Sequence, residues 1–224
     1  MKHQSNSLAL KYRPLNFQDL IGQEYLVETI QKSIQQNKIP NAYIFTGIRG
    51  VGKTTTARIV AKMLNCTVFD KNNNPDLINC EQAKAITEDR HPDVIEIDAA
   101  SNTSVENARE IIENVKYNPV LGKYKVYIVD EVHMLSKSAF NALLKTLEEP
   151  PPHSKFIFAT TEISKVPITI LSRCQRFDLR RVEKKTLSDF LKSIAKKEDI
   201  TISNEALNLI VKACLLYTSD AADE

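Results

Sequence analysis

The segment Gly47-Ile48-Arg49-Gly50-Val51-Gly52-Lys53-Thr54 decides the fold of this chain, because it fits the phosphate-binding pattern G-x-x-x-x-G-K-[ST]. Residues 42–46, which are apolar, precede it as a predicted strand, and residues 55–64 follow it as a predicted helix. The N–H groups of a glycine-rich turn and the N-terminus of a helix both attract an anion. A glycine-rich turn with a chance Lys-Thr pair is the alternative, and the order of strand, loop and helix disfavours it. The segment therefore predicts a site for nucleotide phosphates.

The residue types within the segment predict separate roles. Glycines let the backbone wrap closely around an anion. Lys53 can reach the β- and γ-phosphates of ATP, and Thr54 can hold Mg²⁺. The residues assigned to nucleotide binding in this segment are Gly47, Gly50, Gly52, Lys53, Thr54 and Thr55.

Two carboxylates end the apolar run 125–131, which is a predicted strand. Such a strand resembles the second half of a phosphate-loop ATPase site. Asp130 is the candidate Mg²⁺ ligand, acting directly or through a water molecule. Glu131 is the candidate that polarises the attacking water. Without the phosphate loop, an ordinary acidic strand end would be the better interpretation.

Five predicted strands alternate with predicted helices, which indicates an α/β fold with a parallel sheet covered on both faces. Ligands of such sheets lie at the carboxyl ends of the strands, where Lys53, Asp130, Glu131, Thr160 and Thr161 all fall. The composition shifts near Arg180 from alternating strands and helices to Lys-rich helices. The strands are predicted at 42–46, 94–98, 125–131, 155–161 and 177–179.

Composition and charge exclude several classes of protein. The chain has 224 residues, of which 42% are hydrophobic and 26% charged, as in an ordinary globular protein. Its net charge of +2 implies no strong electrostatic partner. No apolar run reaches membrane-spanning length, and residues 1–5 lack the apolar core of a secretory signal. Four cysteines beside a nucleotide loop favour a reducing compartment. We therefore expect a cytoplasmic protein without a membrane partner.

Motifs outside the phosphate loop carry a resemblance to a known family. Together they resemble the AAA+ clamp-loader ATPases, most closely the gamma/tau group of bacterial DNA polymerase III, and the resemblance covers about residues 8–213. The block from Asp130 to Pro152 is the most specific part. The motifs are residues 11–14, 22–23, 96–101, 130–135, 140–151 and 172–174.

The resemblance implies a function beyond ATP binding. Members of the family use ATP to open a ring-shaped sliding clamp and place it on primer–template DNA. The implied cofactors are ATP and Mg²⁺, and the implied partners are other clamp-loader subunits, copies of the same chain, the clamp and the DNA. Thr161 falls at the family's sensor position. Arg173 matches the arginine finger, which reaches the nucleotide of a neighbouring subunit. The chain would belong to a DNA-directed DNA polymerase holoenzyme without itself carrying a polymerase active site.

The family also carries a four-cysteine zinc module, which this chain matches only in part. Residues 66–92 correspond to the module, and Cys66 and Cys80 match two of the ligands. Ala83 and Ile86 stand where the other two cysteines are expected. A closed zinc site needs four ligands, so we expect a degenerate module in which zinc is doubtful.

The resemblance divides the chain into three parts. Residues 1–180 correspond to the ATPase domain, and residues 181–213 to the first part of a small helical lid. The chain stops before the family's Gly-Ser-x-Arg-Asp sensor helix and collar domain. Residues 214–224 resemble one reading frame of a transposase adapter, so we expect them to be non-native.

Two other functions stay open on the sequence. Residues 130–133 also resemble a helicase box, but the motif at 172–174 and the lack of a second motor domain argue against a helicase. A non-catalytic clamp-loader scaffold is the other alternative, and the intact phosphate loop and acidic pair argue against it. The loop 101–104 could face DNA phosphates, but it has no Lys or Arg. We therefore expect little DNA binding by the isolated chain.

Overall fold

A five-stranded parallel sheet lies at the centre of the computed structural model, which describes residues 7–71, 74–101 and 105–217. The strand order is β2-β3-β4-β1-β5, and every pair of neighbours is parallel. The predicted α/β fold is confirmed. The strands are β1 (Ala42–Thr46), β2 (Val94–Asp98), β3 (Lys125–Asp130), β4 (Ser154–Thr160) and β5 (Gln175–Asp178).

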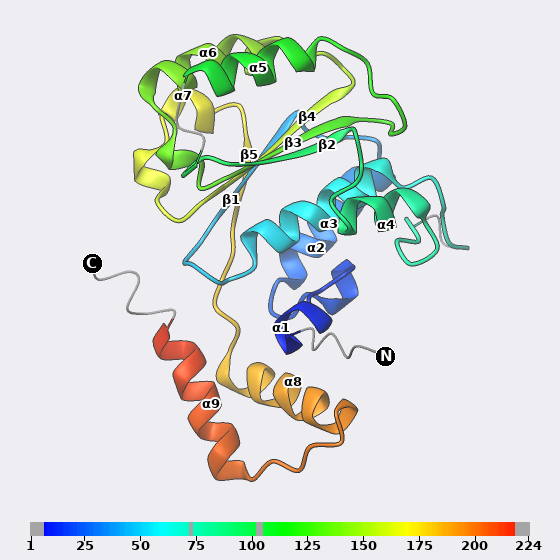
Figure 1. Cartoon of the computed structure of the whole chain (residues 1–224), viewed down its shortest axis with the longest axis vertical. Coiled ribbons are helices and arrows are strands. Elements are labelled where there is room, and N and C mark those ends of the chain that lie inside the picture. The colour runs from blue at the N-terminus through cyan, green and yellow to red at the C-terminus, as the bar shows by residue number, and fades with distance from the viewer. Residues whose placement is uncertain (1–6, 72–73, 102–104, 218–224) are drawn as a thin grey trace, which may run out of the picture.

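Helices cover both faces of the sheet (Figure 1). Successive side chains of a strand point to opposite faces, so the central strands are apolar along their whole length. Ile44 packs in the cluster that includes Phe140 of α6, whereas Phe45 packs in the cluster that includes Val60 of α3. The covering helices are α5 (Val105–Val115), α6 (Lys137–Glu148) and α7 (Ile168–Leu171) on one face, and α2 (Glu24–Gln35) and α3 (Lys53–Asn65) on the other.

Inside the expected zinc module, the structure has a helix that the sequence did not predict. This helix, α4 (Glu81–Thr87), packs beside α3. Ala83 and Ile86, which stand in place of two expected cysteines, are both buried. Apolar packing therefore occupies the positions at which the family would supply thiols. The other short helices are α1 (Leu8–Lys11), η1 (Phe17–Asp19), η2 (Val132–Met134) and η3 (Ile163–Lys165).

Two helices, α8 (Lys184–Lys197) and α9 (Asn204–Tyr217), follow the sheet and lie apart from it (Figure 1). The expected domain boundary at 180–181 falls between β5 and α8. The second of these helices begins after residues 200–203 and continues to Tyr217. Residues 214–217 of the expected non-native tail are thus helical, and the remainder of that tail lies outside the described residues.

A buried glutamine binds the segment that connects the sheet to the C-terminal helices. The side-chain amide of Gln23 donates to the backbone oxygen of Arg180 at 2.7 Å, and its oxygen accepts from the Arg180 N–H at 3.4 Å. Gln23 is itself buried, so these bonds are shielded from water. No helix in the described ranges is both long enough and apolar enough to cross a membrane.

Candidate functional site

The phosphate loop connects β1 to α3, and three of its glycines have positive φ. The φ values are +146° at Gly47, +78° at Gly50 and +100° at Gly52, a region that side chains disfavour. A Cβ atom on Gly47 would lie 2.8 Å from the backbone oxygen of Leu179, so packing requires glycine there. A Cβ atom on Gly52 would meet nothing within 4 Å. The loop is thus closed against the protein at Gly47 and open at Gly52, as a cradle for an anion requires.

Lys53 lies inside this loop. Its side chain is 95% buried, with 5% relative exposure, and its Nζ donates to the backbone oxygens of Gly47 at 2.9 Å and Ile48 at 3.1 Å. Burial lowers the pKa of Lys53, although the carboxylates of Glu131 and Asp130 act in the opposite direction. The ammonium group is therefore placed where the loop's N–H groups would also bind phosphate oxygens.

Thr54, in the first turn of α3, contacts Asp130, the last residue of β3. The Thr54 hydroxyl donates to Oδ2 of Asp130, and the other carboxylate oxygen of Asp130 accepts from the N–H of Glu131 at 2.9 Å. A hydroxyl and a carboxylate are the hard oxygen ligands that Mg²⁺ prefers. The residues present therefore fit the ion that the sequence suggests.

The carboxylate of Glu131 is held by Thr161 at the end of β4. Its Oε2 accepts from the Thr161 hydroxyl at 3.0 Å and from the Thr161 N–H at 3.1 Å. The backbone of Glu131 is left-handed, with φ +45° and ψ +46°, a costly conformation for a residue with a side chain. Such strain is tolerated where the surroundings fix the residue, and here it aims the carboxylate at the strand ends.

His133 extends this network; the sequence predicted it only as part of the motif 130–135 and gave it no role of its own. Its Nδ1 lies 3.0 Å from the hydroxyl of Thr160 and 3.4 Å from Oε2 of Glu131. Its Nε2 lies 3.3 Å from Oε1 of Glu162. The side chain is only 6% exposed, so it packs between the ends of β3 and β4. The feature of the sequence that could have identified His133 as a site residue is its position two residues after Glu131.

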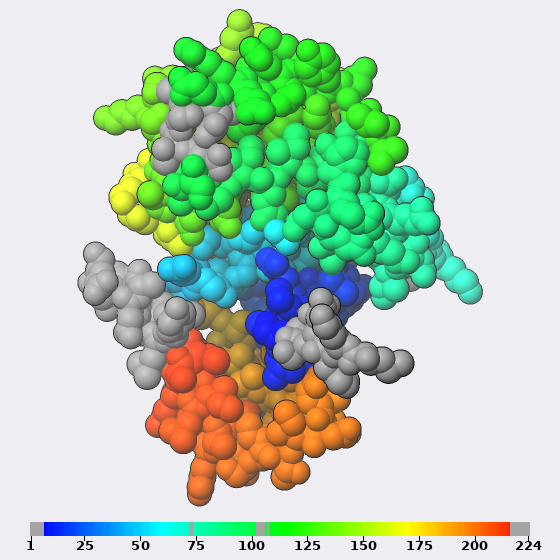
Figure 2. All heavy atoms as spheres, viewed as in Figure 1, coloured from blue at the N-terminus to red at the C-terminus, as the bar shows by residue number. Residues whose placement is uncertain are grey.

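A cavity of about 640 Å³ adjoins the phosphate loop. Figure 2 shows the N-terminal residues filling the space between the sheet and the C-terminal helices. Most of the lining is apolar, which suits the flat ring of a nucleotide base. The sequence predicted residues 11–14 as a family motif and gave no indication that they line a cavity. The lining includes Leu10, Tyr12, Pro14, Ile21, Gly50, Thr55, Val182, Phe190 and Ile194.

The N-terminal segment is tied to both sides of this cavity. The Arg13 Nε donates to the hydroxyl of Thr55 at 3.2 Å, next to the phosphate loop. On the other side, Lys11 Nζ lies 2.5 Å from Oε1 of Glu198, and the Tyr12 hydroxyl donates to the same oxygen. Glu198 follows α8, so the segment connects the phosphate loop to the C-terminal helices.

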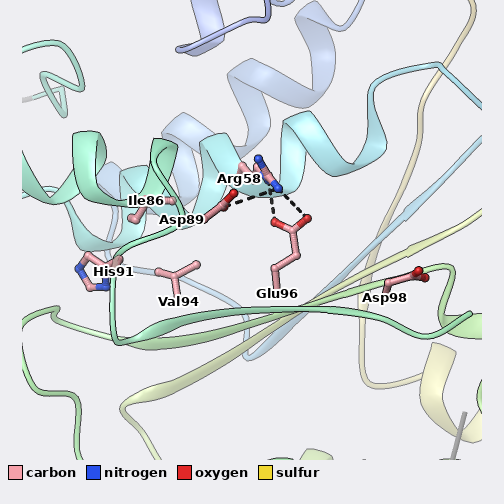
Figure 3. A pocket seen from close by; sticks show the side chains of 7 residues that line it. All are labelled: Arg58, Ile86, Asp89, His91, Val94, Glu96 and Asp98. Carbon is pink, nitrogen blue, oxygen red and sulfur yellow. Dashed lines mark hydrogen bonds and ion pairs between the residues drawn. The ribbon is translucent and has the colours of Figure 1, made fainter. Parts of the chain in front are cut away.

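A second cavity of about 400 Å³ lies between α3, α4 and β2 (Figure 3). Arg58 crosses it and binds Glu96 through two bonds of 2.6 and 2.8 Å, with Asp89 at 3.6 Å. Glu96 occupies both Nε and Nη2 of Arg58, the two groups with which an arginine binds a phosphate side-on, and Asp89 is a second acid beside the guanidinium. We assign this cavity to the packing of α4 and not to phosphate binding.

Arg173 lies outside the cluster around the phosphate loop. Its guanidinium contacts the Thr169 backbone oxygen, the Ser172 hydroxyl and the Glu148 carboxylate. None of these partners belongs to the loop 47–54 or to the acidic pair. The structure thus brings together Lys53, Thr54, Asp130, Glu131 and Thr161, and separates Arg173 from them.

Cys66 and Cys80 are brought together, with Ala83, in a small buried cluster. In the described part of the chain, no three His, Cys, Asp or Glu side chains are arranged to hold a metal ion. Burial raises the pKa of the Cys66 thiol to about 12, whereas hydrogen bonds lower the pKa of the Cys80 thiol against the effect of burial. Most of the loop 101–104, which the sequence suggested could face DNA phosphates, lies outside the described residues.

Comparisons with known proteins show the family of this chain. A family model described as "DNA polymerase III, delta subunit" matches residues 22–183. The tau/gamma subunit of DNA polymerase III from Haemophilus influenzae is 48% identical over 206 residues, covering 92% of this chain and 30% of the relative. The tau subunits from Escherichia coli and Bacillus subtilis are 46% and 48% identical, covering 92% and 90% of this chain and 32% and 36% of the relatives. The chain thus spans about a third of the length of these relatives.

Solved structures show the same fold. RuvB, the Holliday junction branch migration motor of Thermotoga maritima, matches with a TM-score of 0.64 and 18% identity, over 90% of this chain and 59% of that one. A gamma subunit-related protein from the same organism matches with a TM-score of 0.52 and 20% identity, over 76% and 51%. At these identities the likeness concerns the fold alone.

Proposed function

Because this chain belongs to the AAA+ clamp-loader family of DNA polymerase III, with gamma and tau subunits among its relatives, we propose that it is the ATPase part of a motor subunit that loads a sliding clamp onto primed DNA. One observation carries the proposal. The phosphate loop with Lys53, the Thr54–Asp130 contact and the Glu131–Thr161 contact meet at the carboxyl edge of one parallel sheet. These are the parts that phosphoryl transfer requires.

The phosphates of ATP bind at the phosphate loop, and the base binds in the apolar cavity. Lys53 exchanges the backbone oxygens of Gly47 and Ile48 for the β- and γ-phosphate oxygens, which form stronger, charge-assisted hydrogen bonds. Thr54 and Asp130 would hold Mg²⁺, which would supply neutralisation of the charge on the phosphates. The cavity beside Tyr12 receives the base. Zinc has no part in this proposal.

Hydrolysis depends on Glu131 and on a second subunit. Glu131 orients the attacking water and accepts its proton, while the bond from water oxygen to the γ-phosphorus forms and the bond to ADP breaks. Thr161 keeps the carboxylate of Glu131 in place. Arg173 neutralises charge on the phosphoryl group of the nucleotide in a neighbouring subunit.

The partners follow from this shared site. We propose other clamp-loader subunits, further copies of the chain, the sliding clamp and primer–template DNA, in a cytoplasmic holoenzyme whose polymerase active site lies in another chain. An exposed apolar segment supports a protein partner. Tyr117, Val120 and Leu121 are 67, 76 and 58% exposed, on a loop whose N–H groups at 120–122 are fixed by buried Asp93.

The test uses the native full-length protein assembled with its partner subunits. We expect ATP turnover that rises when the clamp and primed DNA are added together, and a clamp that becomes linked to circular DNA. Separation of duplex strands without a response to the clamp would indicate the helicase alternative. Failure to bind ATP in calorimetry would indicate the scaffold alternative.

A further inference from the structure

The guanidinium of Arg173 is fixed by acceptors from two helices. Its Nη2 donates to Oε1 of Glu148, near the end of α6, at 2.5 Å. Its Nη1 donates to the backbone oxygen of Thr169 in α7 at 2.7 Å and to the hydroxyl of Ser172 at 3.3 Å. Of these acceptors, Glu148 alone carries a charge and alone comes from another part of the sequence.

Glu148 and Arg173 both lie next to residues that are buried in the same hydrophobic cluster. Leu147, beside Glu148, and Ile170, three residues before Arg173, are buried in one hydrophobic cluster. Cys174, directly after Arg173, packs against that cluster as well. Because close-packed cores fix position, the backbone segments that carry Glu148 and Arg173 have a defined place relative to each other.

Arg173 retains capacity for a further ligand. A guanidinium has five N–H donors, and the contacts with Thr169, Ser172 and Glu148 use three. Two N–H groups thus remain, which matches the two-bond geometry of arginine with a phosphate. The side chain is 33% exposed, so a phosphate from outside can reach it.

The ion pair itself contributes little to the stability of the fold. The side chains of Arg173 and Glu148 are 33 and 50% exposed, and exposed ion pairs add little to folding free energy. What the pair can supply is orientation, since a free arginine side chain samples many rotamers and positioning strongly affects the rate of a reaction.

We propose that Glu148 is a positioning residue for Arg173. It holds the guanidinium in the orientation with which Arg173 reaches the nucleotide of a neighbouring subunit, while leaving two N–H groups for the phosphate. This inference rests on the proposed function, because it requires the shared site, and it adds a residue to that site.

The test measures turnover in the full assembly with Glu148→Gln, which keeps the size of the side chain and removes its charge. We expect the neighbouring site to turn over roughly 10-fold more slowly or worse, with unchanged ATP affinity, because the chemistry is misaligned and binding is not. Glu148→Asp, which keeps the carboxylate, should recover part of the rate. Glu149→Gln is the matched control, since Glu149 is exposed and forms no side-chain hydrogen bond with another described residue.

Two further measurements separate the possible failures. In assemblies of mixed subunits, Glu148→Gln should slow the adjacent site and spare its own, which a loss of folding stability would not do. Added to Arg173→Ala, it should cause no further loss. If Arg173→Ala slows turnover and Glu148→Gln leaves it unchanged or raises it, Glu148 has no positioning role. If Arg173→Ala also has no effect on the neighbour, the shared site of the proposed function fails as well.

Discussion

The hydroxyl and the backbone N–H of Thr161 both donate to one oxygen of Glu131, at 3.0 and 3.1 Å. The two residues are 30 positions apart in sequence, and they meet because β3 and β4 are neighbours in the sheet. One carboxylate oxygen is thus occupied, which leaves Oε1 as the natural acceptor for a proton from water.

Replacing Glu131 tests its role directly. Glu131→Gln should keep ATP binding and slow hydrolysis at least ~100-fold in the full assembly, because an amide cannot accept the proton from water. Calorimetry and steady-state turnover measure the two effects. Thr161→Val should slow hydrolysis by a smaller factor and Thr161→Ser should retain it, since serine keeps the hydroxyl. Binding that weakens as much as hydrolysis would point to a Mg²⁺-binding or structural role for Glu131.

Lys53→Ala removes the charge that faces the phosphates. ATP binding should weaken about tenfold or more, because a charge-assisted contact is worth ~1.5–3 kcal/mol. Lys38→Ala, at an exposed lysine on the other side of β1, is the control. Calorimetric titration with ATP and Mg²⁺ measures both variants. Equal affinities for the two variants would contradict the phosphate-loop assignment.

Arg173→Ala should show whether Arg173 acts on the nucleotide of its own subunit or on that of a neighbouring subunit. In the full-length assembly, turnover should fall ~10³-fold or more, as at other sites completed by an arginine in trans, while each subunit's own ATP affinity stays unchanged. Mixed assemblies locate the defect. It should fall on the subunit adjacent to the variant, and a defect confined to the mutated subunit would mean that Arg173 acts on its own nucleotide.

Lys62 should make stability depend on pH. Its side chain is 4% exposed, its Nζ has a hydrogen bond of 3.5 Å to the Leu15 oxygen, and burial lowers its pKa to about 8, with Arg58 and Arg13 adding to the shift. Between pH 8 and its ordinary pKa of 10.5 the unfolded chain holds a proton that the folded chain lacks, so the Lys62 contribution to stability rises with pH.

Lys62→Met removes this contribution. At pH 7 the variant should be more stable than the parent. The gain should be on the order of 3 kcal/mol, reduced by the contribution of the lost hydrogen bond, and it should shrink by pH 10. Denaturant titrations across this range measure the free energy of unfolding. Lys145→Met, at an exposed position of α6, should show no such trend. A constant difference for Lys62→Met would show that Lys62 does not titrate there.

Zinc should bind weakly or not at all. Cys66 and Cys80 provide two thiols, and Asp93, a conceivable further ligand, already accepts three backbone N–H groups at 2.7 Å. Two ligands fall short of a closed tetrahedral site. Metal analysis of the purified protein should find far less than one zinc per chain. Stoichiometric zinc that is lost in Cys80→Ser would contradict this.

Local patterns in the sequence determined the fold and the chemical centre of the site. The glycine spacing before Lys53 and the apolar runs ending at Asp130 act within a few residues, so they can be read without knowing the fold. The strand–helix alternation then implies a parallel sheet, whose carboxyl edge gathers these residues.

Tertiary structure alone decided the contacts between distant segments. The contact of Glu131 with Thr161 needs the order of the strands, and the apolar cavity needs the N-terminal segment and α8 on opposite sides of the phosphate loop. The helix α4 is stable because Ala83 and Ile86 are buried against their neighbours. The pairing of Arg173 with Glu148 joins side chains 25 residues apart. Burial and pairing of this kind depend on how the whole chain folds, because folding brings distant segments together. The spacing of residues along the sequence does not contain that information.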